Sequence, residues 1–95
     1  MRIRGIIWKL PFIEKMLLKH NVTTEEVENV IFGRPHVLRA EKGKAQGEDV
    51  YEAFGRTADG RYFSVFFINK SGAALPISAR DMTDSERHYY EKHRT

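Results

Sequence analysis

Arginine, histidine and tyrosine are the side chains of this sequence whose types and positions suit chemistry. Cleavage of RNA without a metal needs a base for the 2′-hydroxyl proton, cations for the scissile phosphate and an acid for the leaving oxygen. Three arginines at the ends of expected strands, Arg56, Arg61 and Arg80, are the candidate cations. Because a guanidinium binds phosphate through two parallel hydrogen bonds, we expect these arginines to hold RNA phosphate and stabilise its charge.

The sequence indicates the general base and the general acid less clearly than the cations. His20 ends the apolar stripe of the first expected helix, so it is a candidate general base or acid and equally a packed polar residue with a backbone partner. Tyr89 and Tyr90 are the candidate acids, although interior tyrosines serve more often as packing anchors. The residues alone therefore leave the base unassigned.

The separation of Arg56 and Arg61 depends on the turn between their strands. If Thr57 and Gly60 close that turn, the two arginines face each other on one side of the hairpin and can hold an anion between them. Two solvated arginines at a hairpin tip are an equal alternative. A two-residue turn over Asp59 and Gly60 shifts the register and moves the pair apart.

Most signatures of catalysis and cofactor binding are absent from the sequence. It has no glycine-rich phosphate loop, no HExxH pattern and no cysteine. Its four histidines match no standard metal-ligand spacing, so we expect neither a metal nor a cofactor. A cysteine-free chain of 95 residues, whose apolar run near the start ends after four residues, predicts one cytoplasmic domain, residues 1–95, with no membrane segment.

Charge is distributed unevenly along the chain. There are 16 basic and 13 acidic side chains, a net charge of +3. Residues 1–20 contain five basic residues and one acidic residue, whereas residues 21–35 are acidic overall. The positive field therefore belongs to the first twenty residues and to the arginines of the sheet, which favours a polyanionic partner.

The apolar pattern predicts an α+β fold: an N-terminal edge strand, an αα-hairpin, an antiparallel β-meander and a C-terminal helix. The strands are expected at residues 2–8, 36–40, 50–56, 61–68 and 74–80, with Pro76 indicating an edge or a bulge. Residues 41–49 are polar and are expected to be mobile. The middle strand is apolar on both faces, so we expect it at the centre of the sheet.

The expected helices have recognisable ends. Capping boxes begin the second helix and the last helix at Thr23 with Glu26 and at Thr83 with Glu86. Asn21 is a plausible left-handed end to the first helix. The buried stripe of that first helix is expected to comprise Leu10, Ile13, Met16, Leu17 and His20.

Several strings resemble the BrnT family of toxins. Trp8, followed by KHNVTTEEV at residues 19–27, resembles the W…KHGV[ST]xEE(A/V) opening of that family. Further along, GRT at residues 55–57, GR at 60–61 and ISAR at 77–80, ahead of Thr83, Glu86, Arg87 and Tyr90, resemble the family core. Where the family commonly has polar residues after the tryptophan, this sequence has Lys9, Leu10, Phe12 and Met16.

The resemblance implies a ribonuclease toxin of a type II toxin-antitoxin pair, with a RelE-like fold. It also implies a small DNA-binding antitoxin that forms a hetero-oligomer with the toxin, and RNA as the substrate. By motif position, the expected catalytic residues are His20, Arg56 and Arg80, and the expected RNA-binding residues are Lys19, Arg61, Ser78 and Arg87.

A second hypothesis fits the same residues without catalysis. The basic face would then only dock an antitoxin or nucleic acid. Incubation with RNA in the presence and absence of a chelator separates the two hypotheses, because a binding module leaves the RNA intact.

Overall fold

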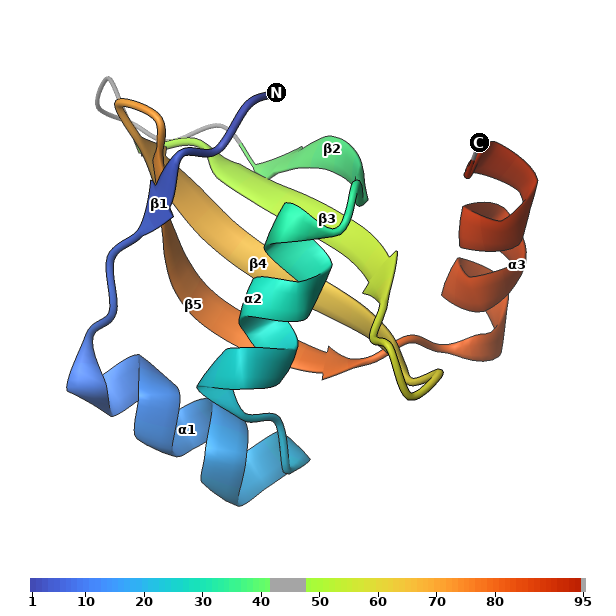
Figure 1. Ribbon diagram of the computed structural model, residues 1–95, viewed down its shortest axis with the longest axis horizontal. Coiled ribbons are helices and arrows are strands. Elements are labelled where there is room, and N and C mark those ends of the chain that lie inside the picture. The colour runs from blue at the N-terminus through green and yellow to red at the C-terminus, as the bar shows by residue number, and fades with distance from the viewer. Residues whose placement is uncertain (42–47, 95) are drawn as a thin grey trace.

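The computed structural model describes residues 1–41 and 48–94 and has a mixed α+β architecture (Figure 1). These residues form a five-stranded sheet and three helices, which confirms the predicted α+β class. The segment expected to be mobile lies largely outside the described residues. Along the chain the elements are β1 (Gly5–Ile6), α1 (Leu10–His20), α2 (Thr24–Phe32), β2 (His36–Glu41), β3 (Val50–Arg56), β4 (Tyr62–Lys70), β5 (Ala73–Asp81) and α3 (Asp84–His93).

The sheet has β4 at its centre, in the strand order β1-β5-β4-β3-β2. β2 to β5 are antiparallel to their neighbours, and β1 adds to the outside of β5 in parallel. The register of β4 against β5 shifts between Phe66 and Phe67, which lie opposite Ser78 and Pro76. A bulge suits Pro76 because proline has no N–H to donate to the ladder.

Helices α1 and α2 lie on the same side of the sheet (Figure 1), which we call the helical face. Phe63, Val65 and Phe67 of β4 are almost fully buried there, in one cluster with Met16 and Val27 of the helices. Because side chains alternate along a strand, the residues between them point to the other side of the sheet, which we call the open face. This division decides which candidate residues can meet.

The helix ends follow local sequence signals. Both predicted capping boxes are present: Thr23 accepts a hydrogen bond from the Glu26 amide and Thr83 from the Glu86 amide. Asn21 ends α1 in the left-handed conformation at φ 54°, as predicted. In the described part of the chain, no helix combines the length and apolar character needed to cross a membrane.

The predicted buried stripe of α1 was wrong at two positions. Met16 is buried, but Leu10 and Leu17 are 65% and 46% exposed. The physical reason is that α1 packs mainly along β5, near one side of the sheet, so only a narrow line of its surface is covered. Leu18, which is also exposed, adds to an apolar surface on the outside of α1.

Candidate active site

The turn between β3 and β4 separates Arg56 and Arg61, which only one of the two turns considered from the sequence would place face to face. The Thr57 amide donates to the Arg61 carbonyl over 2.9 Å, and the Gly60 amide donates to the Thr57 carbonyl over 3.0 Å. Gly60 occupies the left-handed region at φ 88° and adds one residue to the turn. Arg56 therefore lies opposite Tyr62, and the expected face-to-face pairing of Arg56 with Arg61 was wrong.

Arg61 is held on the helical side of the sheet by groups from three elements. Its guanidinium contacts Glu26 at 2.9 Å and Asp81 at 3.3 Å, and it donates to the Asn21 carbonyl over 3.2 Å. It also lies 4.4 Å from the centroid of the Phe63 ring. With its donors directed at protein oxygens, Arg61 braces the α1–α2 connection against the sheet.

Arg56 and Arg87 meet instead on a single tyrosine of the open face. Their guanidinium carbons lie 5.2 Å and 4.0 Å from the centroid of the Tyr62 ring, and the Tyr90 ring packs edge-on against Tyr62. Within residues 1–41 and 48–94, neither guanidinium has a carboxylate within 4.0 Å. This group of Arg56, Tyr62 and Arg87, which we call the arginine clamp, holds two cations whose charge is not neutralised.

Arg80 lies in a second group on the same face. Its two terminal nitrogens bind the two carboxylate oxygens of Glu86 at 2.6 and 2.8 Å, and Glu52 lies 3.9 Å away. Glu52 also accepts a hydrogen bond from the hydroxyl of the buried Ser64 over 2.5 Å. We call Glu52, Ser64, Arg80 and Glu86 the Arg80 cluster; it is contributed by β3, β4, β5 and α3.

The charges of this cluster stabilise each other. The hydrogen bonds from Arg80, aided by those from Thr83, lower the pKa of Glu86 to about 2. The same pairing with Glu86, and the nearby Glu52 charge, raise the pKa of Arg80. Glu86 is therefore ionised at any physiological pH and is a weak base, because a carboxylate with so low a pKa has little affinity for a proton.

A small cavity of about 230 Å³ lies where α3 meets the open face. Its lining includes Glu86 of the Arg80 cluster and Tyr89, both from α3. The Tyr89 hydroxyl is hydrogen-bonded to His36 Nε2 over 3.0 Å, and the His93 ring packs against the Tyr89 ring at 4.1 Å between centroids. The cavity is therefore lined by a carboxylate and by a tyrosine with a histidine partner.

The predicted site residues divide between the two faces of the sheet. Ser78 is paired with Phe66, beside Arg80, and so belongs to the open face. Lys19 and His20 are the last two residues of α1, on the helical face. The open face brings together Arg56, Ser78, Arg80 and Arg87, whereas Lys19, His20 and Arg61 lie on the helical side.

Sequence reasoning missed Glu52, Tyr62 and His36 as candidate functional residues. Glu52 carried a usable sequence signal, since it is the one charged residue in the apolar strand VYEAF. In the structure its side chain is only 14% exposed. A charged side chain at such a position needs a partner. His36 carried no comparable signal, because its contact with Tyr89 joins residues far apart in the chain. The described residues contain no cluster of three or more potential metal ligands.

Comparison with known proteins identifies the family. The sequence model of the ribonuclease toxin BrnT of type II toxin-antitoxin systems matches residues 13–86. The chain belongs to the BrnT family. Members of this family are ribonuclease toxins, and a type II system pairs such a toxin with a protein antitoxin.

A solved structure shares the fold. The crystal structure of the Brucella abortus ribonuclease toxin BrnT superposes with a TM-score of 0.62 at 22% sequence identity, covering 84% of this chain and 97% of that chain. No curated protein matches this sequence. The BrnT fold is therefore maintained although most residues differ between the two chains.

Proposed function

We propose that this BrnT-family chain is a metal-independent endoribonuclease that inhibits translation by cleaving RNA on the open face of its sheet. The observation that carries the proposal is the position of the Arg80 cluster beside the arginine clamp. Arg80 on β5 lies opposite Ser64 on β4, and Tyr62 of the clamp lies two residues before Ser64 on the same face of β4. We further propose that the toxin acts in the cytoplasm as a single RelE-like domain of residues 1–95, neutralised by a small DNA-binding antitoxin.

The proposed reaction begins at Glu52. Its carboxylate takes the proton of the ribose 2′-hydroxyl, the 2′-oxygen attacks the adjacent phosphorus, and the 5′-oxygen of the next nucleotide leaves. The products are a 2′,3′-cyclic phosphate and a 5′-hydroxyl, after the leaving oxygen accepts a proton. Tyr89, hydrogen-bonded to His36, is the candidate donor of that proton because it lines the cavity that Glu86 also lines.

The arginines supply the positive charge that the reaction needs. Arg80 is fixed in place by Glu86 and faces the pentavalent phosphorane, whose extra negative charge it stabilises. The arginine clamp binds a neighbouring phosphate, since Arg56 and Arg87 have no carboxylate within 4.0 Å in the described chain. Two clamp cations offset the repulsion between the RNA and the two carboxylates of the cluster.

One observation favours the alternative, a basic module that binds without cleaving. Arg80 is already neutralised by Glu86 and lies close to Glu52, an arrangement that also suits a purely structural ion pair. In that case the arginine clamp would still bind RNA, and the cluster would only anchor α3 to the sheet. The two functions differ in whether RNA is cut.

The deciding experiment incubates the purified chain with RNA, with and without EDTA, and compares Glu52→Gln with Lys70→Gln. Lys70 is an exposed residue at the end of β4 and serves as the control. We expect cleavage that survives chelation and falls by roughly 10²–10⁴-fold in Glu52→Gln, as for removal of a general base. Circular dichroism verifies that the variants are folded.

Each other result has a definite meaning. Loss of cleavage in EDTA rejects metal independence, and full activity of Glu52→Gln rejects Glu52 as the base. Binding without cleavage supports the module. A parallel His20→Gln variant separates the base suggested by the motif from the base suggested by the geometry.

A further inference from the structure

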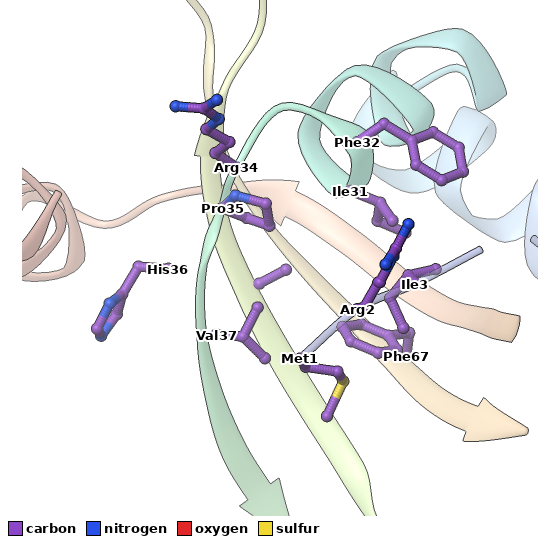
Figure 2. Close-up of a pocket in the computed structure, with 11 residues that line it drawn as sticks. Met1, Arg2, Ile3, Ile31, Phe32, Arg34, Pro35, His36, Val37 and Phe67 are labelled. Carbon is purple, nitrogen blue, oxygen red and sulfur yellow. The ribbon is translucent and has the colours of Figure 1, made fainter. Parts of the chain in front are cut away.

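A second pocket lies on the opposite side of the sheet from the Arg80 cluster. It has a volume of about 360 Å³, at the low end of the roughly 300–1,000 Å³ of ligand pockets. Figure 2 shows it between the first residues of the chain, the end of α2 and the start of β2. We call it the N-terminal pocket.

The base of the N-terminal pocket is apolar and well packed. Ala53 and Phe67 are almost fully buried and Ile31 nearly so, with Ile3 and Val37 beside them. Figure 2 shows the His36 ring directed away from the pocket, on the other side of β2. The side chains that reach into it are therefore hydrophobic and suit an aliphatic or aromatic group.

The rim of the pocket combines exposed apolar groups with positive charge. Phe32 is 54% exposed and Met1 60% exposed, and Arg2 and Arg34 also line the pocket, with the Arg34 guanidinium extended away from the apolar base in Figure 2. Arg34 adopts the left-handed conformation at φ 62°, which is unusual for a residue other than glycine. In the parts of the chain that the structure describes, neither arginine has a carboxylate within 4.0 Å.

The pocket adjoins an open edge of the sheet. Among the described residues, β2 is paired only with β3, so its outer backbone groups are available to an added strand. Val37 belongs to both β2 and the pocket lining. An extended segment that pairs with β2 would therefore direct alternate side chains toward the pocket.

We propose that the N-terminal pocket is a docking site for the antitoxin, and that it receives an apolar side chain flanked by aspartate or glutamate. The apolar floor of the pocket would bury the partner's apolar side chain, as buried pockets do at the centre of interfaces. Arg2 and Arg34 would form ion pairs with the flanking aspartate or glutamate residues. The inference rests on the proposed neutralisation by an antitoxin. It adds the surface and the chemistry of the partner segment.

The pocket lining favours a protein over RNA. Sequence-specific RNA sites stack bases on exposed aromatic faces and hydrogen-bond their edges. Here Phe67 is buried and the histidine points away, so the labelled lining residues offer a single exposed phenyl ring, Phe32 on the rim, and no set of stacking faces for successive bases. The catalytic groups proposed above lie on the other face of the sheet, so an RNA bound here would be remote from them.

The test uses a candidate antitoxin, the product of a short reading frame sought next to this gene. Its affinity is measured by calorimetry for the wild-type chain, for Arg2→Glu/Arg34→Glu and for Phe32→Ala, with Lys9→Glu/Lys70→Glu as the control of equal charge change. We expect the rim double variant to bind roughly 30-fold more weakly or worse, because attraction becomes repulsion. Phe32→Ala should bind roughly tenfold more weakly, since it removes one wall of the anchor site.

RNA cleavage by each variant, without the antitoxin, is the second measurement. We expect it to be unchanged, which also verifies the fold. Antitoxin binding that is unchanged in both pocket variants overturns this assignment while leaving the proposed function intact. RNA cleavage that falls while antitoxin binding holds makes the pocket an RNA site and also overturns it. If the wild-type chain binds no antitoxin, the neutralisation in the proposed function fails together with this site.

Discussion

Replacement of Glu86 by glutamine tests the electrostatics of the Arg80 cluster without disturbing its surroundings. Glutamine keeps the size of the side chain and can still accept the hydrogen bond from the Thr83 amide, so the capping box at the start of α3 is retained. What the substitution removes is the negative charge that binds both terminal nitrogens of Arg80. The variant therefore isolates the contribution of the charge to stability.

The size of the effect follows from the pKa of Glu86, which the Arg80 hydrogen bonds lower from 4.5 to about 2. At about 1.4 kcal/mol for each pKa unit, the shift sets a ceiling of about 3.5 kcal/mol on this contribution. Because the Arg80 side chain is 32% exposed, solvent screening reduces the expected loss in the free energy of unfolding at pH 7 to about 1–2 kcal/mol. For a chain of this size, that corresponds to a melting temperature lower by about 5–15 °C.

The pH dependence gives the prediction its sign. The folded pKa of Glu86 is below the unfolded value, so its stabilisation is complete above about pH 5 and is lost as the pH falls from about 4.5 toward 2. Urea unfolding of wild type and Glu86→Gln, followed by circular dichroism from pH 7 to pH 2, should give curves that converge at low pH. Equal stability at pH 7, or a gap that persists at pH 2, would refute the reasoning.

Three further predictions concern other parts of the molecule. Arg61→Met should lower the free energy of unfolding by about 1–3 kcal/mol in urea melts, because Glu26 and Asp81 lose their ion-pair partner. A free energy of unfolding equal to that of wild type would show that these ion pairs do not stabilise the fold. Gly55→Ala should lower the free energy of unfolding by about 1–3 kcal/mol in the same assay, since the added Cβ would lie 2.9 Å from Val30 Cγ1. Stability equal to that of wild type would mean that α2 can shift away from β3 at no cost. Arg56→Ala and Arg87→Ala should each weaken binding to RNA of any sequence and reduce the salt dependence of log K by about one; an unchanged salt slope excludes the clamp from phosphate contact.

Much of the fold was predictable because its signals are local. A capping box joins residues three apart, as Thr23 and Glu26 show, and the alternation along β4 is read within nine residues. The apolar strand was expected at the centre of the sheet and lies there. The stripe of α1 was predicted less well, because periodicity gives the apolar side of a helix but not how much of it a neighbour covers.

The candidate site was predictable only in part. Arg56, Arg80 and Arg87 were all singled out, and the structure places them on one face, but their proposed roles await experiment. Glu52 escaped notice because its partner Arg80 lies two strands away. Arg61 was expected to bind RNA; its ion pairs with Glu26 and Asp81 on the helical side could not be read from the sequence, and its RNA-binding role stays a prediction.

Local patterns and motifs spread along the chain were enough to predict the class of fold, the helix ends and the BrnT family. Which arginines share a face depends on how the strands pair in three dimensions. That outcome depends on one residue, Gly60, whose left-handed backbone lengthens the turn and sends Arg56 and Arg61 to opposite sides of the sheet. Side-chain direction reverses with every residue of a strand, so a change too small to read in the sequence decides whether two cations meet.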